Sequence, residues 1–214
     1  MQPLPFEVDA GDGIRLRGQV WKGGGDWVVM VHDLGGDLDR WRPLVSPLLE
    51  HGYTVASIDL RGHGASDGDA AHPDVDADLS VAVAGARERC KGMLAVIAEG
   101  AAAVAALTPR LEGRSEGLVL FSPRPEPDQL AGLRGSGTAK LFFVGAADAE
   151  ADRGVTELRN RSIGAAGVIS FATNVQGTGL LQEPWRQHVI EQVVGFLDQL
   201  RSPSATATNE GGTE

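Results

Sequence analysis

Few side chains in this sequence are placed to act as a nucleophile, an acid or a base. Among its 214 residues are five histidines and one cysteine. Cys90 falls on an apolar stripe of a predicted helix, where a thiol is expected to be buried and unreactive. Ser122 ends an apolar run just before Pro123, and no histidine can be assigned to it. A serine or cysteine nucleophile needs a neighbouring base. The sequence pairs no serine or cysteine with such a base.

The remaining candidates have structural explanations. His188 lies on the polar side of the last predicted helix and is expected in solvent. His51 precedes a glycine at a helix end, where histidine commonly faces the last carbonyl groups. His72 lies in a loop. His63 and Ser66 belong to a glycine-rich loop, in which we expect them to form hydrogen bonds that hold the loop together.

The stretch 92–104 brings a strand and a helix together at a sharp turn. An unbroken apolar run over 92–97 predicts a buried parallel strand, and an alanine-rich helical pattern follows at once. In a nucleophile elbow, G-x-S-x-G, serine occupies the apex of such a turn. Residues 98–102 read Ala-Glu-Gly-Ala-Ala, so Gly100 occupies the apex. The stretch has the outline of an elbow without the attacking atom; alternatively, the small residues serve only close packing of helix on strand.

The rest of the chain alternates strand and helix patterns. An antiparallel hairpin is expected at 6–8 and 14–21, with a turn at Asp12-Gly13. Further strands are predicted at 27–31, 53–58, 117–121, 140–144 and 167–172. Helices are predicted at 41–49, from 73 to about 90, at 152–161 and from 183 to about 200. This order predicts a mostly parallel sheet with helices on both faces, whose ligands bind at the carboxyl ends of the strands.

Composition narrows the class of protein and its partners. The chain is 42% hydrophobic and 22% charged with a net charge of −10, which disfavours nucleic acid and anionic membranes as partners. One cysteine excludes an internal disulfide and fits a reducing compartment. No signal peptide or transmembrane run is recognisable, so a soluble, cytoplasmic protein is expected. We expect one domain over 1–201 and a disordered polar tail over 202–214.

Three motifs in this order resemble the α/β-hydrolase family over residues 6–201. The stretch 31–36, Val-His-Asp-Leu-Gly-Gly, with Trp41 is similar to its H-G-x-G-G oxyanion loop and the tryptophan that follows. Asp-Leu-Arg-Gly-His-Gly-Ala-Ser at 59–66 resembles its D-x-R-G-H-G-x-S loop, and Gln-Gly-Thr-Gly-Leu-Leu at 176–181 its H-G-T-x-L-L histidine loop. The resemblance implies a single α/β-hydrolase-type domain of about eight strands. The connection 122–140 is too short for a cap domain.

The resemblance also assigns the positions of the family's catalytic triad. The nucleophile falls on Gly100, the acid on Asp148 and the base on Gln176. Glycine cannot be acylated, and a glutamine amide cannot act as a base near neutral pH. Asp33 replaces the first glycine of the oxyanion loop, where its charge would repel a developing oxyanion. No residue is therefore expected to be catalytic. The expected pocket comprises His32, Asp33, Leu34, Glu99 and Ala101, with no cofactor and no metal.

Three functions stay open at this point. The first is a catalytically silent homologue that binds a small molecule or a protein partner. The second is an enzyme with new chemistry, because Asp33, Glu99 and Asp148 would approach one mouth and could hold a divalent cation or raise the pKa of one carboxyl group. Against this, Glu99 could point into solvent and Asp148 could only cap a helix. The third is residual carboxylic-ester hydrolysis, which requires a different triad.

Overall fold

The apolar runs of the sequence form the strands of one mixed sheet. The computed structural model describes residues 2–11, 13–133 and 136–201; the predicted tail 202–214 lies outside them. The sheet has eight strands in the order β1-β2-β4-β3-β5-β6-β7-β8. Two pairs, β1 with β2 and β2 with β4, are antiparallel and all other pairs are parallel, which confirms the mostly parallel sheet that was predicted. The strands are β1 Leu4–Asp9, β2 Arg15–Trp21, β3 Trp27–Val31, β4 Thr54–Ile58, β5 Leu94–Glu99, β6 Gly117–Phe121, β7 Ala139–Gly145 and β8 Ala166–Phe171.

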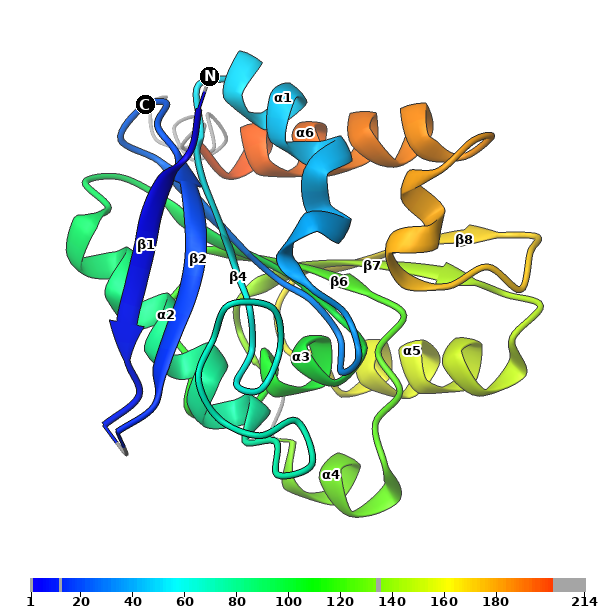
Figure 1. Ribbon diagram of the computed structural model, residues 1–214. Helices are drawn as coiled ribbons and strands as arrows, with labels where there is room; N and C mark the ends of the chain where they lie inside the picture. Colours follow the sequence, from blue (N-terminus) through cyan, green and yellow to red (C-terminus); the bar gives the residue numbers. More distant parts are fainter. Residues whose placement is uncertain (1, 12, 134–135, 202–214) are drawn as a thin grey trace, which may run out of the picture.

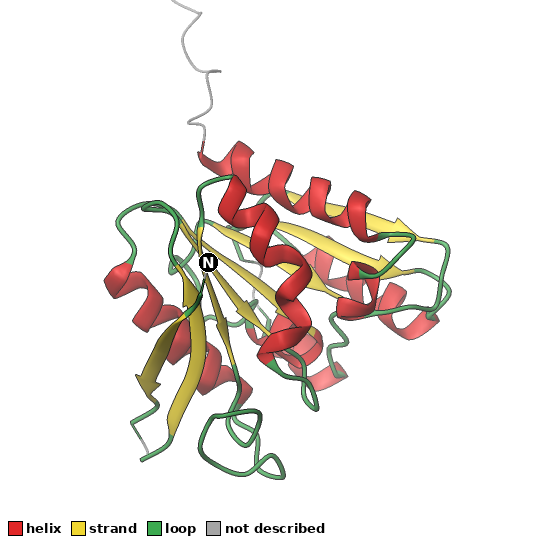
Figure 2. Cartoon of the chain, turned by 45° about the horizontal axis from the view of Figure 1, so that its top comes forward, coloured by secondary structure: helices red, strands yellow, loops and turns green. Residues whose placement is uncertain are grey.

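Helices cover both faces of the sheet, as Figures 1 and 2 show. Helices α2, α3 and α5 pack on one face, and α1 and α6 on the other. The alternation of side chains along a strand divides the core between the faces: in β3, Val29 and Val31 meet the first group, and Val28 and Met30 the second. The helices are α1 Arg42–Glu50, α2 Val75–Arg89, α3 Gly100–Ala105, α4 Pro127–Gly132, α5 Ala149–Arg161 and α6 Arg186–Arg201, with 3₁₀ helices η1 Leu38–Trp41 and η2 Gly177–Leu181.

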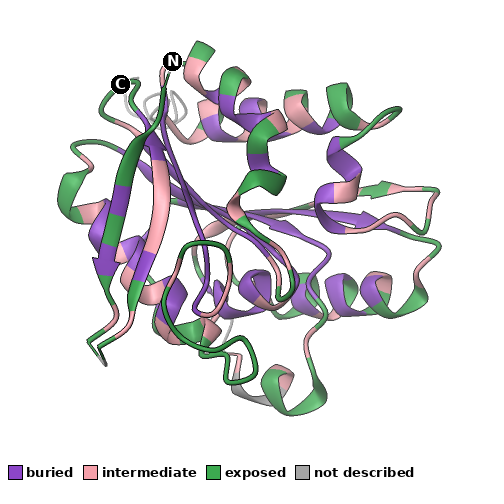
Figure 3. Ribbon diagram, viewed as in Figure 1, coloured by how far each residue is buried: buried purple, intermediate pink, exposed green. Residues whose placement is uncertain are grey.

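The central strands are buried on both faces, which explains their continuous apolar sequences (Figure 3). Every residue of β3, β4, β5 and β6 is buried. The carboxyl ends of β3 and β5 therefore hold the loops that follow them in fixed positions. Among the described residues, no helix combines the length and the apolarity needed to cross a membrane.

Two local predictions are wrong in detail. Cys90 packs against the same core as the buried face of α2, but it is the C-cap residue of the helix and is only half-buried. The segment between β6 and β7, for which no helix was predicted, contains α4, which starts with a capping box between Glu126 and Gln129. The capping-box pattern is present in the sequence, but it lies among prolines and was not recognised. In the described part of this segment α4 is the one helix, so no cap domain is inserted there.

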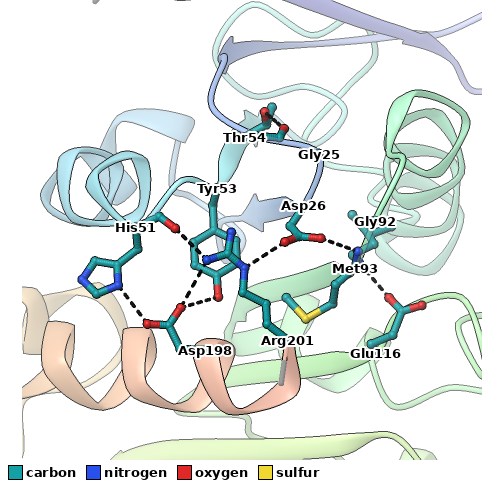
Figure 4. A network of polar contacts seen from close by, with 12 residues as sticks. Gly25, Asp26, His51, Tyr53, Thr54, Gly92, Met93, Glu116, Asp198 and Arg201 are labelled. Atoms are coloured by element: carbon teal, nitrogen blue, oxygen red, sulfur yellow. Dashed lines mark hydrogen bonds and ion pairs between the residues drawn. The ribbon is translucent and has the colours of Figure 1, made fainter. Parts of the chain in front are cut away.

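A polar network connects the carboxyl-terminal end of α6 to the residues just before strands β3 and β4 (Figure 4). Arg201 donates to Asp26 at 2.8 Å and to the carbonyl of His51 at 2.7 Å. Its guanidinium lies 3.9 Å from the ring centroid of Tyr53, whose hydroxyl donates to Asp198 at 2.8 Å. The ring of His51 bonds the same carboxylate, so it does not face the helix carbonyls as predicted. This network holds α6 in place behind η2 and the loop that contains Gln176.

Candidate functional site

A cavity of about 350 Å³ opens where β3, β5 and β6 end. Six of the eight residues singled out by the sequence line it: Asp33, Leu34, Glu99, Gly100, Ala101 and Gln176. His32 and Asp148 do not line it. The remaining lining residues come mainly from the segment after β6, which sequence reasoning did not place there: Ser122, Arg124, Glu126, Gln129 and, from η2, Gly177.

The turn from β5 into α3 has the geometry of a nucleophile elbow. Glu99 ends the strand, and Gly100 starts the helix with a φ of +55°, in the left-handed region that favours glycine. A Cβ atom at Gly100 would overlap the carboxyl group of Asp33. Close packing of the helix on the strand therefore does not by itself explain the glycine at this position. Gly100 leaves room for a specific side chain from another loop.

The Asp33 carboxylate fills that room and takes two backbone hydrogen bonds. Its Oδ1 accepts from Leu34 N–H and from Ala101 N–H, both at 2.8 Å. In an α/β hydrolase the oxyanion hole is formed by the N–H after the nucleophile and an N–H of the loop after β3. Ala101 and Leu34 occupy these two positions. The sequence predicted that Asp33 would repel an oxyanion; the structure shows that its carboxylate binds the donors directly.

His32 lies beneath this loop and is not a pocket residue, which corrects the prediction. Its ring is fully buried, Nε2 accepts from Leu60 N–H at 3.1 Å, and Nδ1 lies 2.7 Å from the carbonyl oxygen of Asp33. Because Nε2 accepts, the proton is on Nδ1, which donates to Asp33. Burial lowers the pKa of His32, so the ring is neutral. His32 positions the Asp33 backbone.

The glycine-rich loop 59–66 supports the Asp33 loop from outside, as predicted for His63 and Ser66. His63 Nε2 accepts from Gly35 N–H at 2.9 Å, and Ser66 Oγ donates to the carbonyl of Asp59 at 2.7 Å. The loop is anchored to α2 by a buried pair in which Arg61 Nε and Nη2 donate to Asp78 Oδ1 at 2.8 and 2.7 Å.

Gln176, at the position expected for the base, is held in a local network. Its Nε2 donates to the carbonyl of Gly145 at 2.8 Å, and its Oε1 accepts from Ser122 Oγ at 2.5 Å. Ser122 also accepts from Gly177 N–H at 2.8 Å and has a positive φ of 45°, unusual for a residue other than glycine. A strained serine next to a base position carries no sequence motif, so sequence reasoning did not link it to Gln176.

Asp148 acts as the N-cap of α5, as the structural alternative proposed. Its Oδ1 accepts from Glu150 N–H and Ala151 N–H, both at 3.1 Å, and its Oδ2 lies 2.5 Å from Arg124 Nη2. The bond from Ala151 N–H and the Arg124 charge lower the pKa of Asp148. Of the three carboxylates that the second function left open, Asp33 and Glu99 line the cavity and Asp148 does not. Among the described residues, no group of three His, Cys, Asp or Glu side chains could hold a metal ion.

Glu99 is buried in the cavity wall, which corrects the alternative that placed it in solvent. Glu99 is only 7% exposed to solvent. Oε1 accepts from Thr178 N–H at 2.9 Å, whereas Oε2 is buried and has no hydrogen-bond partner among the described residues. Burial and, to a smaller extent, the negative charge of Asp33 raise the pKa of Glu99, against the opposing effect of the Thr178 bond.

A larger, mainly apolar cleft of about 710 Å³ adjoins the cavity. Leu34, Ala101 and Gln129 line both, so the two spaces share a wall. Leu34 is 43% exposed, and it is one of three large hydrophobic residues exposed in the described chain. Val104 and Leu133 continue the apolar surface away from the cavity. Together the two spaces have the size and lining of a small-molecule site.

The other histidines lie away from the cavity. His72 bonds Asp69 in an exposed loop, and His188 is exposed on α6, beside Phe171. Across residues 2–11, 13–133 and 136–201, no serine or cysteine side chain is hydrogen bonded to a histidine ring. The third function left open by the sequence required such a pair.

Comparison with known proteins agrees with this architecture. A family profile described as "Serine aminopeptidase, S33" matches residues 26–147. The chain belongs to this family, which has the α/β-hydrolase fold.

Solved structures show the same fold over nearly the whole chain. The esterase Pf2001 of Pyrococcus furiosus is similar with a TM-score of 0.74 at 17% identity, covering 94% of each chain. Est1E of Butyrivibrio proteoclasticus, solved with ferulic acid bound, has a TM-score of 0.74 at 13% identity over 91% of this chain and 98% of its own. Mouse α/β hydrolase domain-containing protein 10 has a TM-score of 0.73 at 12% identity over 92% and 99%.

One curated relative is similar over a short segment. The dihydrolipoyllysine-residue acetyltransferase component of the acetoin cleaving system of Cupriavidus necator is 47% identical over 55 residues. The match covers 26% of this chain and 14% of that relative.

Proposed function

We propose that this protein is a catalytically silent α/β-hydrolase homologue that binds a small molecule in the cavity and cleft beside Gly100. The observation that carries the proposal is the position of the Asp33 carboxylate, which accepts from the two N–H groups of the oxyanion hole. An ester carbonyl cannot use donors that a fixed anion already occupies.

Two further features support loss of the ancestral reaction. Gly100 offers no atom to form an acyl intermediate. The Gln176 side chain is held by Ser122 and Gly145, and an amide does not take up a proton near neutral pH. The nucleophile and the base of ester hydrolysis are absent, and the oxyanion hole is occupied. The volumes of the cavity and the adjoining cleft favour a small-molecule ligand over a protein partner, and we place this binding role in the cytoplasm.

The test is turnover of p-nitrophenyl acetate and p-nitrophenyl butyrate by the purified wild-type protein. We expect no hydrolysis above that of a Gly100→Ala variant and of buffer. Turnover that co-purifies with the protein through two unrelated columns and persists in the heat-treated, refolded sample would overturn the proposal. A small-molecule screen by thermal shift on the same preparation then tests the binding half, with stabilisation in proportion to ligand concentration as the expected result.

A further inference from the structure

The unpartnered oxygen of Glu99 is the feature of the cavity that the fold itself does not explain. Native proteins rarely leave a buried polar atom without a hydrogen bond, because such an atom loses its water partners and gains nothing in return. Glu99 Oε1 is used by Thr178, but Oε2 has no partner in the described chain. Glu99 is only 7% exposed, and it lines the cavity. A ligand in the cavity would supply the missing partner.

The charge around Glu99 indicates which form of the carboxyl group meets that ligand. Asp33 and Glu126 are the acidic groups that share the cavity with it, and Arg124 is engaged with Asp148. Arg40, from η1, is a cation whose charge opposes the rise in the pKa of Glu99. An ionised Glu99 would be buried beside a second carboxylate, which is strongly unfavourable. Burial and the Asp33 charge raise its pKa accordingly, and a protonated carboxyl group is a hydrogen-bond donor.

We propose that Glu99 donates a hydrogen bond to the oxygen of a neutral carbonyl compound in the cavity, with the apolar part of that ligand in the adjoining cleft. This inference rests on the proposed binding function and names its ligand class. A carboxylate ligand is disfavoured because Asp33 already occupies the backbone donors beside Gly100. An ammonium ligand is disfavoured because it would need Glu99 to ionise. The exposed Leu34 side chain, shared by both spaces, provides the apolar contact at their junction.

The experiment compares three probes of the same chain length: 2-octanone, octanoate and octylammonium. Dissociation constants are measured by ligand-observed NMR on the full-length wild-type protein from pH 5 to 9 at constant ionic strength. We expect 2-octanone to bind at least roughly tenfold more tightly than either ion near pH 6, where octanoate is almost fully ionised; tenfold is the value of one good hydrogen bond. Its affinity should fall as pH rises through the titration of Glu99, because the donor proton is lost.

Variants separate Glu99 from the apolar cleft. Glu99→Gln keeps a donor amide and should retain binding without the pH dependence, whereas Glu99→Ala should lose roughly tenfold in affinity. Glu112→Gln, a glutamate in an exposed turn, is the matched control and should behave as wild type. In Asp33→Asn the loss of 2-octanone binding should move to lower pH, because a negative charge that raises the Glu99 pKa is gone.

Each other outcome overturns the inference. Tightest binding of octylammonium, increasing with pH, would make this a cation site. Tightest binding of octanoate would mean that the backbone donors are free. Binding of 2-octanone that ignores pH and both Glu99 variants would place it in the cleft alone, and no binding of any probe would reject the ligand class. The wild-type pH profile keeps the test valid if Glu99→Ala fails to fold. Failure of the proposed function is seen separately, as ester turnover.

Discussion

The carboxyl group of Asp33 occupies the space that a side chain at Gly100 would need. The two residues lie 67 positions apart in the sequence, and their loops meet because β3 and β5 are neighbouring parallel strands. Each explains the other. The Asp33 carboxylate fits into the oxyanion hole because the apex residue has no Cβ, and a serine side chain at the apex would overlap that carboxylate.

This relationship predicts strong coupling between the two positions. Gly100→Ser alone should destabilise the protein by about 1–3 kcal/mol. The new side chain would overlap Asp33, and the backbone at this position has a positive φ that serine rarely adopts. In an Asp33→Gly background most of the overlap is removed and only the backbone strain remains. Urea unfolding of the four proteins of this double-mutant cycle measures the coupling, which we expect to be about 0.5–3 kcal/mol. Additive effects would contradict the shared occupancy.

Glu99 should make stability fall as the pH rises. Its pKa in the folded protein is raised above the ordinary value of 4.5, so the folded state binds more protons than the unfolded state above that pH. The stability that protonated Glu99 allows is complete below pH 4.5 and is lost as the pH rises through the folded-state pKa. Glu99→Gln cannot ionise, so its advantage over wild type should grow from pH 4.5 upward. Thermal unfolding between pH 4 and 9 tests this; a constant difference would refute it, and Glu112→Gln should show no trend.

The buried pair of Arg61 and Asp78 should be important for stability. Asp78→Ala leaves a buried guanidinium without its carboxylate and should cost about 3–5 kcal/mol. Arg61→Met combined with Asp78→Ala removes both charges and should recover part of the loss. Glu88→Ala, exposed on the same helix, is the control and should change stability by less than about 0.5 kcal/mol. Denaturant titration gives all four values. Equal loss in the single and double variants would show that the ion pair is not the cause.

The sequence predicted the sheet well because its signals are local. Buried parallel strands such as β3 and β5 are continuous apolar runs, and the motif residues at 31–36, 59–66 and 176–181 mark the loops at their ends. Gly100 at the expected apex position and Gln176 at the expected base position could be read in the same way. What could not be read was where side chains point. Asp33 turns into the oxyanion hole and Glu99 into the cavity wall because of backbone donors at Ala101 and Thr178, which no motif specifies.

Restoration of activity tests the occupied oxyanion hole most directly. p-Nitrophenyl butyrate hydrolysis is measured for the wild type, for Gly100→Ser/Gln176→His, and for the same pair combined with Asp33→Gly. We predict an inert wild type, an inert pair, and hydrolysis above background only in the triple variant, because only there are the N–H groups of Leu34 and Ala101 free for an oxyanion. Hydrolysis by the pair at the rate of the triple variant would show that Asp33 does not close the hole, and would contradict the account.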